Sequence, residues 1–183
     1  LLLDPEEGVR QAAAIALGKV AAPGAASREA LVFALAGPDA SLRAAAAWAL
    51  GNLGSKDESV TRALLKALDD PVEEVRESAA MSVGRVGGSS WSWKRLLSGL
   101  GDNSFHVRVG SAMALGKSDD LPEEAFAELA KALRDPSAHV RIAAAGALAR
   151  QKGRAEAFFL KWISALGASS AEREKPRESP DSP

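Results

Sequence analysis

The stretch that decides the fold runs from Asp70 to Gly84 and reads DPVEEVRESAAMSVG. The same pattern of residue types occurs five times along the chain. Aligned on the Val-Arg pair, or Leu-Arg in the second copy, the arginines are spaced 33, 33, 32 and 33 residues apart, and they are Arg10, Arg43, Arg76, Arg108 and Arg141. A fixed period of this length is typical of a repeat protein in which each unit packs on its neighbours.

Each copy predicts two helices. The first carries leucines three and four residues apart, as at Leu64, Leu65 and Leu68, which is the spacing of a buried helical stripe. The second follows the arginine and is rich in alanine, so that helix backbones can approach closely. It ends in glycine in four copies, as at Gly51, and we expect this glycine to provide a left-handed C-terminal turn. Neither helix could bury its stripe alone, so stacking makes the core.

Aspartate and proline separate the two helices. Asp70 stands six residues before its arginine and Pro71 follows it, and four of the five copies share each feature. We expect the aspartate carboxylate to cap free amide groups and the proline to occupy the first helical turn, where the amide has no partner.

The pattern DPxxxVRxxAAxALG resembles the HEAT repeat, particularly the short variety named after phycobilisome lyases. The resemblance covers roughly residues 1–167 and implies an all-α, right-handed solenoid of about five two-helix repeats. It also implies a ladder of aspartates and arginines between neighbouring units. Two departures are expected to weaken that ladder: Gly37 replaces aspartate in the second unit, where Asp39 is a substitute, and Asn103 replaces proline in the fourth.

The predicted solenoid domain covers residues 1–168. Its N-terminal repeat is incomplete, because Leu1 to Leu3 match only the last turn of a first helix, and we expect an excised piece of something longer. A helix around Phe158 and Trp162 should fold back as a C-terminal cap. Residues 169–183 are polar and rich in proline, so we predict a disordered tail.

Composition excludes several classes of protein. With 46% hydrophobic and 26% charged residues the chain is globular in type, and a net charge of −1 provides no overall attraction for nucleic acid. Without cysteine there is no disulfide, thiolate zinc site or thiol nucleophile. No run approaches the ~20 apolar residues of a membrane span. We therefore expect a cytoplasmic protein with no nucleic-acid or membrane partner.

The resemblance also implies which residues face a partner, because the helix with Val-Arg lines the concave side of such arrays. Carried over, the predicted partner-binding residues are Ile15, Trp48, Glu73, Glu74, Glu77, Met81, Phe105, His106, Val109, Met113, His139 and Ile142. This face is more apolar than a solvated surface should be. We predict a groove for an amphipathic helix or extended peptide, with Trp48, Met81 and Met113 as anchors and the glutamates selecting a basic flank. The alternative is that curvature buries these residues between helices.

Other features suggest weaker hypotheses. Trp91 and Trp93 form a possible second binding patch. His106 and His139 occupy equivalent places in adjacent units and could lie side by side, but without a third ligand they favour a solvated pair over a metal site. The repeat arginines are expected to be structural, because their period matches the fold.

We predict a scaffold or adaptor that binds another protein or peptide, without a cofactor. No nucleophile with a base, no pocket of paired carboxylates and no metal cluster is visible. The iron hydroxylases among HEAT-like proteins carry His-Glu pairs, whereas His106 and His139 are each followed by valine. The alternative function is an accessory subunit of a bilin lyase or a similar modifying complex. A third hypothesis, a DNA-binding HEAT-like protein, is opposed by the acidic residues Glu73, Glu74 and Glu77.

Overall fold

The computed structural model describes residues 1–20, 24–55, 57–87, 93–118, 121–151, 153–161 and 163. Throughout these ranges the regular secondary structure is helical. The helices are α1 (Glu7–Gly18), α2 (Ala25–Leu35), α3 (Ala40–Asn52), α4 (Glu58–Ala67), α5 (Glu73–Val86), α6 (Trp93–Gly99), α7 (Phe105–Gly116), α8 (Glu123–Ala132) and α9 (Ala138–Arg150). A further helical segment covers 153–161 and 163. Trp91, Trp162, Leu166 and the predicted tail 169–183 lie outside the described residues.

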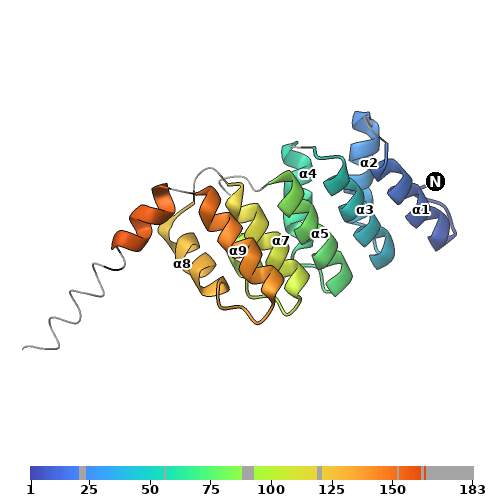
Figure 1. The fold of residues 1–183 in the computed structure, drawn as a ribbon. Helices are drawn as coiled ribbons and strands as arrows, with labels where there is room; N and C mark the ends of the chain where they lie inside the picture. Colours follow the sequence, from blue (N-terminus) through green and yellow to red (C-terminus); the bar gives the residue numbers. More distant parts are fainter. Residues whose placement is uncertain are drawn as a thin grey trace, which may run out of the picture.

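The helices form a solenoid of two layers (Figure 1). The Val-Arg helices α1, α3, α5, α7 and α9 lie side by side, and we call them the inner layer. Helices α2, α4, α6 and α8 form the outer layer, each packed on the inner helix that follows it. Inner helices contact their neighbours closely, whereas α2 with α4 and α6 with α8 meet at few positions. The inner layer is therefore packed more tightly than the outer layer.

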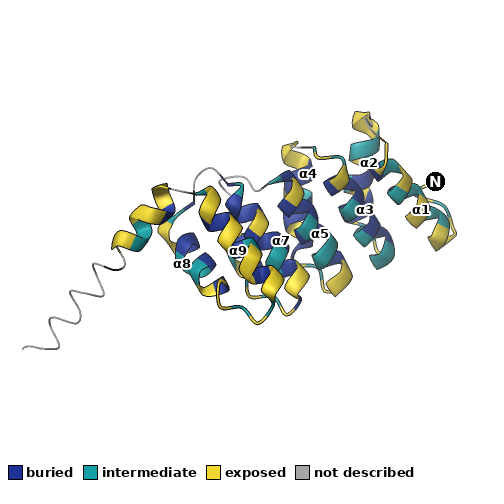
Figure 2. Ribbon diagram, in the orientation of Figure 1, coloured by how far each residue is buried: buried dark blue, intermediate teal, exposed yellow. Residues whose placement is uncertain are grey.

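The core lies between the layers, as the leucine stripes predict (Figure 2). Leu64 of α4, Leu96 of α6 and Leu129 of α8 are fully buried, and so are the valines of three Val-Arg pairs, Val75, Val107 and Val140. The alternation of an outer leucine helix with an inner alanine helix therefore builds one continuous core rather than five separate ones.

The glycines that end the inner helices have a role different from the one predicted. Among the described residues only Gly54 and Gly87 have positive φ, so Gly18, Gly51, Gly84 and Gly116 make no left-handed turn. Instead they let neighbouring inner helices approach. A Cβ atom placed on Gly116 would lie 2.6 Å from the Cα of Ala147, and one on Gly18 would lie 2.6 Å from the Cα of Ala49. These distances are shorter than any real carbon contact, so only glycine fits.

The aspartates of the repeat also have a role different from the predicted one, because they accept hydrogen bonds in the turn just before the helix. Asp70 accepts a hydrogen bond from the amide of Val72 at 2.9 Å, and Asp135 accepts one from Ser137 at 2.8 Å. Both donors precede their helix, so the carboxylate closes the turn before the helix instead of capping it, and the proline stands in that turn. Among the aspartates that the structure describes, only Asp39 is a true cap, accepting from the amide of Leu42 at 3.2 Å.

Candidate functional site

Arginine and aspartate form the predicted ladder, which holds the inner helices in register. Arg43 donates to both carboxylate oxygens of Asp70, at 2.7 and 3.0 Å, and so connects its own unit to the next. Its Nη1 also donates to the carbonyls of Gly37 and Pro38. Equivalent ion pairs join each unit to the following one, and they are Arg10–Asp39, Arg76–Asp102 and Arg108–Asp135. These pairs confirm a structural role for the first four repeat arginines.

The two departures from the pattern do not break this ladder. Asp39 replaces the missing aspartate at Gly37 and accepts one hydrogen bond from Arg10 at 2.6 Å. Beside Asn103, Arg76 donates to Asp102 at 3.0 and 3.4 Å, which is longer than the bonds of the Arg43–Asp70 and Arg108–Asp135 pairs and fits the expected weakening. Asn103 nevertheless keeps the backbone part of the ladder. Its carbonyl accepts a hydrogen bond from Arg108 at 2.9 Å, as proline carbonyls do in other units, because the acceptor belongs to the backbone.

The ladder shifts the ionisation of its carboxylates. Arg10 donates a hydrogen bond to Asp39 and lowers the pKa of that carboxyl group below its ordinary value. Arg108 has the same effect on the pKa of Asp135. Burial raises the pKa of Asp70 and Asp102, but the arginine and the backbone amide that donate to each carboxylate outweigh burial, so both pKa values are lowered. All four aspartates are therefore held in the charged form.

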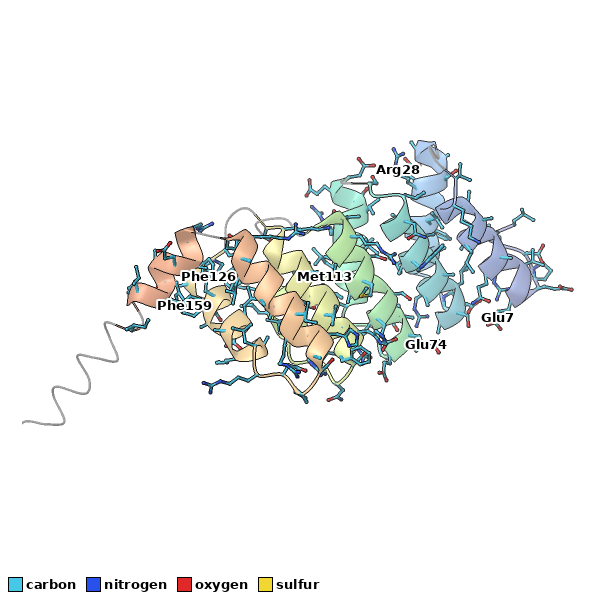
Figure 3. The ribbon with its side chains drawn as sticks, viewed as in Figure 1. Glu7, Arg28, Glu74, Met113, Phe126 and Phe159 are labelled. Atoms are coloured by element: carbon cyan, nitrogen blue, oxygen red, sulfur yellow. The ribbon has the colours of Figure 1, made fainter. Side chains whose placement is uncertain are left out.

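The inner layer exposes an apolar row, which we define as Ile15, Trp48, Met81, Val109, Met113 and Ile142. Ile142 is 71% exposed and Met113 is 36% exposed, while Ile15, Trp48, Met81 and Val109 are half-buried. The row is thus neither fully solvated nor sealed between helices. Figure 3 shows Met113 midway along α7, on the face of the inner layer.

A groove of about 290 Å³ opens along this row between α7 and α9. Val109, Met113 and Ile142 contribute apolar side chains to it, and Gly146 leaves room because it has no side chain. His139 lines the groove toward the start of α9, and Lys117 and Arg150 line it toward the helix ends. The groove therefore combines an apolar floor with polar groups at its two margins.

Glu77 organises a polar cluster at the start of α7. Its Oε1 accepts hydrogen bonds from the hydroxyl of Ser104 and from His106 Nδ1, the latter at 3.0 Å. Burial raises the pKa of Glu77, but these two donors outweigh burial and the pKa is lowered. The Phe105 ring lies 3.9 Å from that of His106 and 5.8 Å from that of His139, centroid to centroid. The two histidines thus gather around one phenylalanine.

The remaining predicted residues lie at the beginning of α5. Glu73 and Glu74 are both exposed in the first turn of this helix. Figure 3 places Glu74 and Glu7 along one edge of the inner layer, where the Val-Arg helices begin. The acidic side chains therefore border the apolar row and are not part of its floor.

Sequence reasoning missed a row of polar residues at the opposite edge, where the inner helices end. It contains Lys19, Asn52, Arg85, Lys117 and Arg150, which share one position of the repeat. Arg85 donates to the side-chain oxygen of Asn52 at 2.9 Å, and Lys117 donates to the carbonyl of Arg85 at 2.6 Å. Four of the five residues are cations, and the 33-residue period was the signal that could have revealed them. We call the four cations the basic edge, and Glu7, Glu73, Glu74 and Glu77 the acidic edge.

The second predicted patch is only partly described. Trp93 begins α6, where it is half-buried against the core and has the ammonium group of Lys94 5.4 Å from its ring centroid. Among the residues that the structure describes, no group of three or more His, Cys, Asp or Glu side chains could hold a metal ion. No helix in the described ranges is long and apolar enough to cross a bilayer.

The two ends of the stack differ. A cavity of about 1060 Å³ lies at the N-terminal end, where α1 and α2 line it with residues that include Leu17 and Phe33. At the other end Phe158 stacks on Phe126 of α8, with 5.7 Å between ring centroids, and Lys161 pairs with Glu123 at 2.7 Å. The segment 153–161 therefore packs against helix α8, and whether it closes the stack as a cap stays a prediction.

Comparisons with known proteins show which proteins share this fold. A family model described as HEAT repeats matches residues 28–90 and 93–168. The complex of CpcE and CpcF of phycocyanin lyase from Nostoc sp. is similar, with a TM-score of 0.73 and 24% identity over 91% of this chain and 67% of that chain. A designed armadillo repeat protein in complex with the peptide (KR)4 has a TM-score of 0.67 and 22% identity over 97% of this chain and 90% of that one. No curated protein matches the chain. Identities this low show the fold alone.

Proposed function

Since this chain belongs to the HEAT-repeat family, we propose that it is an adaptor that binds another protein or peptide through the apolar row of its inner layer. The observation that carries this proposal is the partial exposure of that row. Ile142 is 71% exposed and Met113 36% exposed beside a groove, in a chain whose other large aliphatic side chains are mostly buried. An apolar patch bordered by polar groups is the usual form of a protein-binding surface.

The side chains of the row suit this task. Trp48 is a large, stiff anchor, and Met81 and Met113 adapt their shape to a partner because their side chains have three rotatable bonds. The arginine ladder fixes the helices that carry them, so little ordering is needed when a partner binds. The similarity to the phycocyanin lyase complex does not extend the proposal to bilin chemistry, because at 24% identity it concerns the fold only.

The experiment is affinity capture from native lysate with the wild-type chain and a Met113→Glu/Ile142→Glu variant. Both positions are exposed, so circular dichroism should show unchanged helix content. Leu160→Glu is the matched control, because Leu160 is 62% exposed but lies in the helical segment that packs against the outer helix α8. We expect a partner retained by the wild type and by Leu160→Glu and lost by the double variant. A partner retained by the double variant would refute the apolar row as the binding site.

A further inference from the structure

The apolar row lies between two edges of opposite charge. The acidic edge stands where the inner helices begin and the basic edge where they end. Helix α5 carries both, with Glu73 and Glu74 in its first turn and Arg85 in its last. Helix α1 repeats the arrangement with Glu7 and Lys19, and α7 and α9 add Lys117 and Arg150. The carboxylates come from α1 and α5, whereas α7 and α9 begin without acidic residues. A partner seated on the row therefore meets carboxylates over α1 and α5 on one side and cations along the other.

The distance between the edges indicates what fits between them. Glu73 and Arg85 are twelve residues apart on one helix, which at about 1.5 Å per residue is about 18 Å. A helix with its side chains is about 10–12 Å across, so a single helix fits between the edges and its long charged side chains reach both. An extended strand points its side chains to two opposite faces only. It cannot offer an apolar face to the floor and charged groups to both edges.

From this charge complementarity we propose that the inner layer binds one amphipathic helix of the partner, and that opposite charges on its two flanks set the direction in which it lies. The bound helix has an apolar stripe on the row, lysine or arginine facing the acidic edge, and aspartate or glutamate facing the basic edge. This inference rests on the proposed function and specifies its partner.

These charges also have a structural role, which is compatible with the proposed role in binding. Acidic residues at helix starts and basic residues at helix ends stabilise any helix through its dipole, and the outer helix α8 shows the same signs with Glu123 and Lys131. The inner layer differs because its cations border the groove-forming apolar row. Lys117 and Arg150 line the same groove as Met113 and Ile142.

The direction of binding gives a sharp test. A helix laid on the row can be turned end for end, which exchanges its left and right flanks in space. The test uses two designed 20-residue peptides with the same leucine stripe. One has lysine on the left flank and glutamate on the right, and the other has these residues exchanged. Both peptides should bind equally well but in opposite directions. A photo-crosslinker on the peptide N-terminus should then label α1 and α3 with one peptide and α7 and α9 with the other.

Affinity, followed by fluorescence anisotropy, tests the two edges separately. Either peptide should bind more tightly than peptides whose flanks are all lysine or all glutamate, and 0.5 M NaCl should reduce that preference because salt screens exposed charges. Glu73→Gln/Glu74→Gln and Arg85→Gln/Arg150→Gln should each weaken binding of the mixed peptides by about threefold to tenfold. The control Glu124→Gln/Lys66→Gln changes the same types of charge in the outer layer and should leave binding unchanged.

Three outcomes would overturn the inference. If all four peptides bind equally and Met113→Glu/Ile142→Glu abolishes binding, the apolar row binds helices without reading charge, and the proposed function stands alone. If the exchanged peptides crosslink the same end, charge does not set direction. If no peptide binds the wild type, the helix is the wrong occupant, and lysate capture decides the proposed function independently.

Discussion

Arg108 of α7 donates to both carboxylate oxygens of Asp135, at 2.8 and 3.0 Å, so a single guanidinium joins one repeat to the turn that begins the next inner helix. The same arginine also donates to the carbonyls of Asp102 and Asn103 in its own unit. Both partners of the ion pair are largely shielded from water, with side chains 14% and 10% exposed. This geometry predicts that the ladder contributes measurably to stability.

We expect Asp135→Ala to lower the free energy of unfolding by about 1.5–3 kcal/mol, because two hydrogen bonds between charged groups are lost and Arg108 keeps its charge without that partner. Urea unfolding followed by circular dichroism measures this. Glu58→Ala is the control, since it removes an ion pair with Arg62 whose side chains are 68% and 70% exposed, and it should cost at most about 0.5 kcal/mol. Equal losses for both variants would mean that the ladder adds nothing beyond a surface pair.

The lowered pKa values of Asp39, Asp70, Asp102 and Asp135 predict instability in acid. A carboxyl group whose pKa is lower in the folded state binds protons preferentially when unfolded. Its contribution is therefore present above the unfolded value of about 3.9 and is lost as the pH falls through the lower, folded value. The free energy of unfolding should vary little between about pH 7 and 5 and fall below about pH 4.

The contribution of one ladder pair to this acid sensitivity can be isolated. Asp102→Asn removes one titrating carboxylate, so the variant should be less stable at pH 7 but should lose less stability between about pH 5 and 3 than the wild type. Urea unfolding at each pH measures both. An unchanged loss in acid would assign the sensitivity to carboxylates outside the ladder.

Two glycine substitutions should have opposite effects. Gly116→Ala would place a Cβ atom 2.6 Å from the Cα of Ala147, and this backbone atom cannot yield as a flexible side chain could, so we expect a loss of about 1–3 kcal/mol. Gly146→Ala lies within α9 with no atom within 4 Å of the new Cβ, so we expect a gain of about 0.5–1 kcal/mol from helix propensity. Thermal and urea unfolding of both variants measure this, and a destabilised Gly146→Ala would contradict the open space at that position.

The burial of two leucines predicts different losses of stability when each is replaced by alanine. Leu115 is fully buried in α7, so Leu115→Ala should cost about 2–5 kcal/mol in unfolding free energy. Leu133 follows α8 and is 38% exposed, so the same change there should cost clearly less. A loss below about 1 kcal/mol at Leu115, measured by urea unfolding, would be inconsistent with a packed core at that position.

Much of the fold was predictable because each repeat interacts mainly with the next. The period located the Val-Arg and leucine helices, Val75 and Leu64 are buried as their spacing predicts, and the ladder arginines pair as the pattern implies. The positions of the candidate partner-binding residues could also be predicted, since all of them lie on the inner layer. Their role in binding remains a prediction, which the capture and peptide experiments test.

The sequence by itself determined the repeat, the helix pairs and the residues that each unit directs toward its neighbours, because these depend on local spacing. Only the tertiary structure decided how closely neighbouring units approach. That approach explains why Gly116 serves close packing and not a turn, and why Asp39 can substitute for an aspartate at Gly37. The physical reason is that these features depend on distances between backbones of different units, which the period of a sequence does not contain.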